Sequence, residues 1–413
     1  MENLRIPYGK KELKIKLNLT KEIKFDILKP EEKNGLTNIL EKIKDALNTP
    51  INSPPLRKLA LNKRNACIII DDLTRPLPSN LLLPPVVNEL EKGGIKKDKI
   101  KVIIALGLHR PLKKEEKKKL VGSIFEEIKV FNHNPYKNLM YLGKTSFGTE
   151  IYLNKNFLKA DLKIIISDVE FHQLFGYGGG AKSLHPGIGD AESIKNIHSR
   201  LDLPGAEAGI FKGNPLREEI EEIGNMVNVD FSLNVVLNSN KKICGIFAGR
   251  LSSAFQKAIK LVDKMYKVKI SCLYDLVIVS AGGYPRDINL YQAQKAIEAA
   301  RKIVKKGGKI ILFAECSEGW GSQLFKNWMK NAKGPENIKK KIKKDFFIGA
   351  HKAYLLAKEL EWAKIYIYSD MKPEEVKKAF LIPVRLEEIN DIVKDEKNIA
   401  FLPFGTITLP QIL

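Results

Sequence analysis

Several side chains that could carry out acid–base or binding chemistry stand just after short apolar runs of this sequence. They are Asp72 and Arg75, then His109, then His172, and finally Tyr291, Gln292 and Lys295. Histidine titrates near neutral pH, so His109 and His172 are candidates for giving and taking protons. Taken one at a time, such residues often cap a helix or form a weak surface ion pair. Their repeated placement after apolar runs favours a shared site instead.

A glycine-rich stretch surrounds Lys182 and reads FHQLFGYGGGAKSLHPGIG from residue 171 to 189. A Walker phosphate loop requires GxxxxGK, but Ala181 precedes Lys182 and Gly176 lies one residue out of register. A Rossmann fingerprint is also absent, because these glycines do not follow an apolar run directly. Two interpretations stay open: a tight turn before a helix, or backbone that approaches a phosphate while Lys182 reaches a bound group.

Metal-binding motifs are scarce in the chain. The remaining histidines are His133, His185, His198 and His351, and no HExxH or HxxxH pair occurs, so a zinc hydrolase is not indicated. A single histidine could still hold a metal if another molecule supplied the other donors. The cysteines form no CxxC pair, which argues against a zinc ribbon or a disulfide framework.

The elements that must position these residues alternate between apolar strands and amphipathic helices. Strands are expected at 66–71, 101–107, 162–168, 276–282, 309–315, 364–369 and 398–405. Near-continuous apolar strands separated by helices indicate a mostly parallel sheet, so the fold class is α/β. Ligands of such sheets bind beyond the carboxyl ends of the strands, where the polar residues stand. One helix is expected from about residue 289 until Gly307 and Gly308 end it.

The length of 413 residues predicts two domains. We expect an N-terminal α/β domain over 1–270 and a C-terminal α/β domain over 275–390. Residues 395–413 are a candidate to return to the first domain as a final strand. No apolar run of about eighteen residues and no signal-peptide core is present, so a cytoplasmic protein without a membrane span is expected.

The formal net charge of +22 has two interpretations. A basic surface can bind nucleic acid, whereas Lys-rich solvated helix faces are typical of thermophile-type proteins. The basic runs carry Lys rather than Arg and lack interleaved aromatic residues, which favours the second interpretation. A positive field would still attract a small anionic substrate.

Five motifs together resemble the nickel-pincer lactate racemase family. They are DDLTRP (71–76), GLHRP (107–111), FHQLFGYGGGAKSLHPG (171–187), NIHSR (196–200) and LYQAQKA (290–296). The resemblance implies two α/β domains with the active site in the cleft between them. It also implies an isomerase that racemises or epimerises a 2-hydroxy acid, with cofactor-biosynthesis proteins as partners.

The resemblance further implies a role for each matching residue. Nickel would be held in a pincer nucleotide attached covalently to Lys182, with His198 as the protein ligand of the metal. His109 and His172 would be the acid/base pair on opposite faces of the substrate carbon, and hydride would pass to the pincer nucleotide. The cofactor or the substrate would be lined by Asp72, Arg75, Tyr291, Gln292 and Lys295.

The sequence leaves two residues of the proposed site unexplained and two other functions open. Family members specific for lactate carry a tryptophan where this chain reads FIGAHKAYLLA (347–357) with His351, so the sequence leaves the particular 2-hydroxy acid open. The role of His185 also stays open. The alternatives are a nucleotide-binding oxidoreductase or kinase-like enzyme, and a basic nucleic-acid-binding protein.

Overall fold

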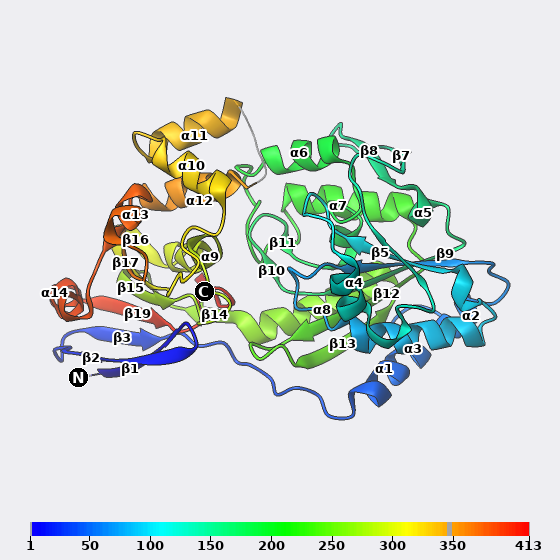
Figure 1. Ribbon diagram of the computed structural model, residues 1–413. Coiled ribbons are helices and arrows are strands. Elements are labelled where there is room, and N and C mark those ends of the chain that lie inside the picture. Colours follow the sequence, from blue (N-terminus) through cyan, green and yellow to red (C-terminus); the bar gives the residue numbers. More distant parts are fainter. Residues whose placement is uncertain (1, 345–348, 413) are drawn as a thin grey trace. The chain divides into compact units, whose positions relative to one another are not determined.

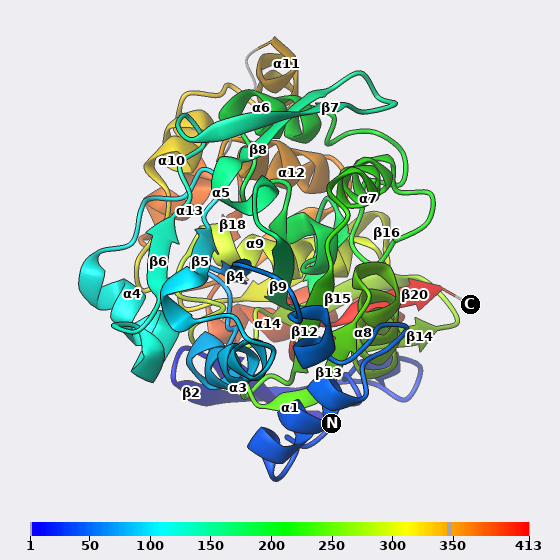
Figure 2. The same ribbon diagram turned by 90° about the vertical axis from the view of Figure 1, so that its right-hand side faces the viewer.

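Two six-stranded, mostly parallel sheets organise residues 2–344 and 349–412, which are the residues that the computed structural model describes (Figures 1 and 2). The chain divides into two units. The first comprises Glu32–Met265, and the second combines Met1–Glu31 with Tyr266–Leu413. The two α/β units agree with the fold class expected from the sequence. Their boundaries differ from that expectation, because the first 31 residues belong with the C-terminal part of the chain.

The sheet of the first unit has the strand order β13-β12-β9-β4-β5-β6. Its members are β4 (Ala66–Asp71), β5 (Ile100–Ala105), β6 (Lys129–Asn132), β9 (Leu162–Asp168), β12 (Phe231–Leu237) and β13 (Ile243–Gly249). All neighbours run parallel except β12 and β13. The central strands β4 and β9 are buried almost throughout, which explains their continuous apolar sequences.

Shorter elements of the first unit surround its glycine-rich stretch. The hairpin strands β7 (Leu139–Lys144) and β8 (Glu150–Asn154) are followed by β10 (Phe171–His172), β11 (Gly176–Tyr177) and the 3-10 helix η3 (Gly180–Ser183). Next come α6 (Ala191–Ser199) and α7 (Pro215–Val227), which lie beside the β7–β8 hairpin in Figure 1. The remaining helices are α1 (Ile39–Asn48), α2 (Leu56–Leu59), α3 (Ser79–Lys92), α4 (Lys114–Val121), α5 (Lys155–Leu158) and α8 (Leu251–Tyr266).

The second unit has a parallel sheet in the order β18-β17-β16-β15-β19-β3. The strands are β3 (Lys24–Ile27), β15 (Tyr274–Ser280), β16 (Val304–Phe313), β17 (Lys364–Tyr368), β18 (Ile382–Pro383) and β19 (Asn398–Leu402). The hairpin β1 (Glu2–Tyr8) and β2 (Lys11–Leu17) packs its apolar side chains into the same core. A last parallel pair joins β14 (Lys267–Ile270) to β20 (Leu409–Ile412).

The C-terminal residues 395–413 do not return to the first unit. Strand β19 pairs in parallel with β15, with Leu276 opposite Ile399 and Val279 opposite Leu402. Both strands are buried apolar segments, so their pairing completes the core of the second unit. The N-terminal strand β3 then covers the other edge of β19.

One helix ends earlier than the sequence suggested. Helix α9 (Leu290–Arg301) stops before the glycine pair, and Gly307 and Gly308 lie inside β16 instead. A Cβ on Gly308 would lie 2.7 Å from the Asp275 carbonyl oxygen, so the glycine at this position permits close strand packing. The other helices of this unit are α10 (Gln323–Lys330), α11 (Pro335–Lys344), α12 (His351–Leu360), α13 (Pro373–Lys378) and α14 (Ile389–Val393).

Within the described part of the chain, every helix is too short or too polar to cross a membrane.

Candidate functional site

The end of β4 supplies a carboxylate that orients His109. The His109 Nδ1–H donates to Asp72 Oδ2 at 2.7 Å, while the backbone N–H and hydroxyl of Thr74 donate to Asp72 Oδ1 at 3.1 and 2.6 Å. Burial raises the pKa of Asp72, but the bonds from His109 and Thr74 outweigh it, so the net pKa is lowered. The Asp72 side chain is 5% exposed and that of His109 is 55% exposed. In the neutral ring this contact places the proton on Nδ1, so that Nε2 is the acceptor nitrogen.

Arg75 lies among carboxylates at the same edge of the sheet. Its Nη1 donates to Glu170 Oε1 at 2.7 Å. Burial lowers the pKa of Arg75, but Glu170, Asp168 and Asp71 outweigh it and raise the net value. Arg75 therefore stays a cation, held by an acidic neighbour that the sequence did not single out.

Two buried carboxyl groups, Asp71 and Asp168, face each other where β4 and β9 end. Asp71 Oδ2 accepts the Asp168 backbone N–H at 3.1 Å, and Asp168 Oδ1 is buried with no hydrogen-bond partner in the structure. Burial raises the pKa of both groups, that of Asp168 well above its ordinary value. Burial, together with the repulsion of Glu170 and Asp71, raises the pKa of Asp168 and so favours its protonated form.

The glycine-rich stretch is a tightly held turn over the end of β9. Strands β10 and β11 form a small antiparallel pair that places His172 opposite Gly176. Gly179 has a φ of +75°, and a Cβ there would lie 2.5 Å from the Asp168 carbonyl oxygen. Buried Arg217 donates to the carbonyl oxygens of Tyr177 at 3.0 Å and Gly179 at 3.5 Å. Only glycine fits this close approach, and the backbone is fixed from both sides.

Three predicted site residues lie against the ring of Phe175. The centroid of its ring lies 5.0 Å from that of His172, 5.0 Å from that of His198, and 5.8 Å from Lys182 Nζ. The His172 Nδ1 accepts the backbone N–H groups of Leu174 and Phe175 at 3.3 and 3.2 Å. Its proton therefore resides on Nε2, which is the opposite tautomer from His109.

The pKa of Lys182 is well below that of an ordinary lysine. Burial, followed by the repulsion of Arg75, lowers the pKa of Lys182 to about 7, although Asp71 and Glu170 oppose the change. A large fraction of the amine is therefore neutral near pH 7, and a neutral amine can act as a nucleophile.

His198 presents one ring nitrogen to the same region. It lies in the last turn of α6, where its Nδ1–H donates to the Ile194 carbonyl oxygen at 2.8 Å. Burial lowers the pKa of His198 to about 4, so the ring is neutral and Nε2 is the atom able to bind a metal. No group of three or more His, Cys, Asp or Glu side chains suited to a metal occurs among the residues described here. Further metal donors would have to come from a bound molecule.

His185 is a buried residue that braces the N-terminal end of α6. Its Nε2–H donates to the Ser193 hydroxyl at 2.8 Å, because that hydroxyl itself donates to Asp190 Oδ2. Burial, then the nearby His198, lowers the pKa of His185 to about 3.

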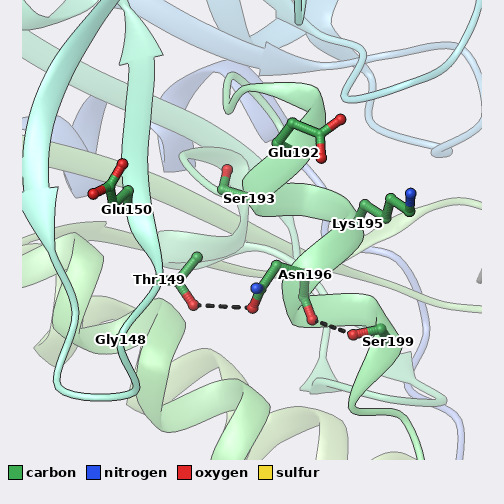
Figure 3. Close-up of a pocket in the computed structure, with 8 residues that line it drawn as sticks. All are labelled: Gly148, Thr149, Glu150, Glu192, Ser193, Lys195, Asn196 and Ser199. Atoms are coloured by element: carbon green, nitrogen blue, oxygen red, sulfur yellow. Dashed lines mark hydrogen bonds between the residues drawn. The ribbon is translucent and has the colours of Figure 1, made fainter.

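Helix α6 also borders a surface pocket of about 470 Å³, lined by Thr149, Ser193, Lys195 and Asn196 among others (Figure 3).

The remaining predicted residues, Tyr291, Gln292 and Lys295, lie in the first half of α9 in the second unit. Asn289 caps this helix by accepting the Gln292 backbone N–H at 3.0 Å. The Tyr291 ring contacts the ring of His351 at 6.5 Å between centroids, and burial raises the pKa of Tyr291. Part of the stretch at 347–357, namely 347 and 348, lies outside the described residues.

Sequence reasoning missed Phe175, Glu170 and Arg217. Phe175 and Glu170 lie close to residues that the sequence did single out, Asp168 and His172, and this proximity was the available signal. Arg217 comes from α7, some 35 residues beyond Lys182, so only the folded chain brings it to the glycine turn.

Comparisons with known proteins cover nearly the whole chain. The lactate racemase N-terminal domain matches residues 8–209 and the lactate racemase C-terminal domain matches 268–405. A lactate racemase of Thermoanaerobacterium thermosaccharolyticum is 33% identical over 98% of both chains. Another, of Lactiplantibacillus plantarum, is 33% identical over 72% of this chain and 71% of its own length.

Solved structures give the same result for the fold. The lactate racemase apoprotein of T. thermosaccharolyticum superimposes with a TM-score of 0.91 at 32% identity, covering 99% of this chain and 100% of the other. A Thermotoga maritima protein shares the fold at a TM-score of 0.67 and 21% identity, covering 92% of this chain and 100% of its own.

Proposed function

Because the chain belongs to the lactate racemase family and is therefore an isomerase, we propose that it racemises lactate or a closely similar 2-hydroxy acid at the site described above. The observation that carries this proposal is the convergence of His172, His198 and Lys182 on the ring of Phe175. An acid/base histidine, a metal ligand and a reactive amine would then stand together within one unit of the protein.

We further propose that the resident cofactor is a nickel-pincer nucleotide bound covalently to Lys182. The residues fit such a group in three respects. The amine of Lys182 has a pKa of about 7, His198 offers a neutral Nε2, and the backbone at Gly179 leaves no room for a side chain. When bound, this group would supply a hydride acceptor, which avoids deprotonating a very weakly acidic carbon next to a carboxylate.

His109 is proposed as the base for the substrate hydroxyl. In the neutral ring Nε2 would be the acceptor, and the imidazolium formed when it accepts a proton would be stabilised by the Asp72 carboxylate at 2.7 Å. A carboxylate that holds a histidine by Nδ1 fixes both the tautomer and the ring orientation. Asp72 would thus act on the substrate only through His109.

His172 is proposed as the second acid/base group. The two backbone N–H groups directed at Nδ1 keep the proton of the neutral ring on Nε2. In this state Nε2–H would donate a hydrogen bond to the substrate oxygen, and Nε2 would take up a substrate proton only after its own proton had moved to Nδ1. The two histidines would therefore offer complementary groups, one acceptor and one donor.

Cations are proposed to bind the anionic parts of the substrate and cofactor. Arg75 retains its charge beside Glu170, and its remaining guanidinium N–H groups suit a carboxylate. Lys295 is proposed for the same role, with Tyr291 and Gln292 as further binding residues. The net charge of +22 would raise the local concentration of such anions.

The test is to produce the chain together with cofactor-biosynthesis proteins and to follow interconversion of L- and D-lactate and of other 2-hydroxy acids. Intact mass spectrometry should reveal an adduct that is lost in Lys182→Ala. His109→Ala and His172→Ala should each abolish racemisation while the thermal unfolding transition is preserved. Cofactor-loaded protein that neither contains nickel nor interconverts any 2-hydroxy acid would contradict the proposal.

A further inference from the structure

We propose that Arg200 and Glu219 are positioning residues for His198, because their ion pair fixes the last turn of α6. This inference rests on the proposed function of His198 as a metal ligand. It also explains the motif NIHSR (196–200), in which only His198 had received a role.

Helix α6 spans nine residues, which is too short to be stable alone. The conformation of its last turn matters because His198 Nδ1–H donates to the carbonyl oxygen of Ile194, one turn earlier. That bond keeps the proton on Nδ1 and directs Nε2 away from the helix backbone. If the last turn frays, the bond is lost, and with it both the tautomer and the direction of Nε2.

The N-terminal end of α6 is fixed by a local cap. Asp190 Oδ1 accepts the Ser193 backbone N–H at 2.9 Å, and His185 Nε2 bonds to the Ser193 hydroxyl at 2.8 Å. This cap secures the first turn only, so the turn with His198 needs a second anchor.

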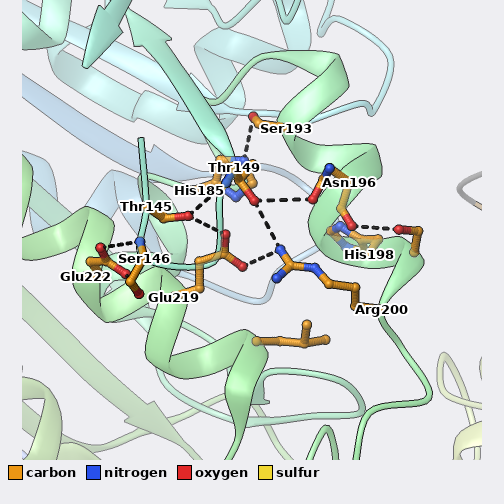
Figure 4. Close-up of polar contacts among 12 residues, drawn as sticks. Thr145, Ser146, Thr149, His185, Ser193, Asn196, His198, Arg200, Glu219 and Glu222 are labelled. Carbon is orange, nitrogen blue, oxygen red and sulfur yellow. Dashed lines mark hydrogen bonds and ion pairs between the residues drawn. The ribbon is translucent and has the colours of Figure 1, made fainter. Parts of the chain in front are cut away.

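The C-terminal end of α6 is anchored by a polar network (Figure 4). Arg200, which follows the last helical residue, forms an ion pair with Glu219 of α7. The same Nη2 donates to the Thr149 hydroxyl at 3.2 Å, and that hydroxyl donates to Asn196 Oδ1 at 3.2 Å. The network therefore grips α6 at two positions, Asn196 and Arg200, on either side of His198.

Both carboxylate oxygens of Glu219 have a partner. Its side chain is 0% exposed, and its other oxygen accepts the Thr145 hydroxyl at 2.8 Å. A buried ion pair stabilises a fold poorly, because desolvation offsets its attraction, whereas it can specify one geometry. We infer that the pair is present here to hold one arrangement of α6 against α7 and the β7–β8 hairpin.

The chain offers a matched control for Glu219 in Glu222. Glu222 lies one turn later on α7 and also binds the β7–β8 turn, because the Ser146 backbone N–H and hydroxyl each donate to it at 2.7 Å (Figure 4). The Glu222 carboxylate bonds to the hairpin without bonding to α6. Glu219→Gln and Glu222→Gln therefore remove the same charge from the same helix, and each alters a contact with the hairpin, at Thr145 and at Ser146 respectively. Only the first also alters the link to Arg200.

The decisive measurement is the imidazole ¹⁵N spectrum of His198 in the full chain without cofactor, labelled at histidine and assigned with His198→Ala. We expect the parent and Glu222→Gln to show the proton on Nδ1. In Glu219→Gln the fraction with the proton on Nε2 should rise several-fold. This measurement requires no racemase activity, so its outcome is independent of whether the proposed function holds.

In cofactor-loaded enzyme, Glu219→Gln should lower kcat with little change in KM, because Glu219 acts on His198 only through Arg200. The loss should be smaller than the roughly 10- to 100-fold caused by removing a direct partner of a metal ligand. Arg200→Lys keeps the charge but loses the planar guanidinium group, so it should change the His198 spectrum and kcat less than Glu219→Gln does. It replaces Glu219→Gln as the test variant if Glu219→Gln does not fold. An unchanged His198 spectrum in both variants would overturn the proposal, and so would equal changes in Glu219→Gln and Glu222→Gln.

Discussion

Replacing Asp72 by Asn tests the proposed base most directly. Thr74 donates two hydrogen bonds to Asp72 Oδ1, so the amide of an Asn side chain would keep its oxygen toward Thr74 and turn its NH₂ toward His109. An NH₂ group facing Nδ1 requires that nitrogen to be unprotonated. The proton of His109 would then move to Nε2, which could no longer accept the substrate proton.

The size of the effect follows from the contact that is lost. Asp72 and the ring of His109 are 2.7 Å apart and Asp72 is almost fully buried, so the bond is charge-assisted in the imidazolium form. Such bonds contribute about 1.5–3 kcal/mol. Because His109 is 55% exposed and its ring can turn toward water, we do not expect more than this. A loss of about 2–3 kcal/mol corresponds to a reduction of roughly 30- to 150-fold in kcat/KM.

The assay is racemisation of L-lactate by loaded enzyme with the cofactor content measured for each variant. Thr74→Val is the control, since it removes one bond to Asp72 and keeps the carboxylate. It should lose less activity than Asp72→Asn. If Asp72→Asn, equally loaded and equally stable, stays within about threefold of the parent rate, His109 does not depend on Asp72 and the reasoning is refuted.

Three further predictions concern the glycine turn. Lys182 should react with an amine-selective acylating reagent at a rate that rises with pH and levels off above about pH 7, because its pKa is about 7 and the neutral amine reacts. Peptide mass spectrometry measures this rate. A rate that still rises toward pH 10, as for ordinary lysines, would contradict the prediction. Gly179→Ala should lower the free energy of unfolding by about 1–3 kcal/mol, owing to its φ of +75° and the clash with the Asp168 carbonyl oxygen; chemical denaturation measures it, and an unchanged midpoint would show that the turn relaxes. Arg217→Lys should cost about 1–3 kcal/mol because the Tyr177 carbonyl loses its buried donor, and a melting temperature equal to the parent's would show that the lysine replaces that bond.

The sequence predicted the scaffold of the site well, for a physical reason. The strands at 66–71 and 162–168 are buried on both faces, so their sequences are continuous apolar runs whose ends are sharply marked. Polar residues directly after such ends must lie at one edge of the sheet. The position of Asp72 and His109 therefore followed from local pattern alone.

Other features depended on pairings that no local pattern encodes. Strand β3 has only four residues, and its place beside β19 joins positions more than 370 residues apart in the chain. The resulting grouping of the first 31 residues with the C-terminal unit could not be read from residues near either strand. The burial of Arg217 and Glu219 could not be predicted from the sequence either, because a charged residue in a helix normally faces solvent. Only the tertiary packing of α7 buries both side chains.

Thermodynamics limits how the separate roles of His109 and His172 can be measured. Two enantiomers have equal free energy in water, so the equilibrium constant is one and kcat/KM must be the same in both directions for every variant. Asp72→Asn must therefore lower both values equally, even though His109 is the one histidine of the pair that it contacts. Any difference between the histidines can appear only in kcat and KM taken separately. If kcat/KM does differ between directions, the substrate has a second stereocentre, and the enzyme is an epimerase for that substrate.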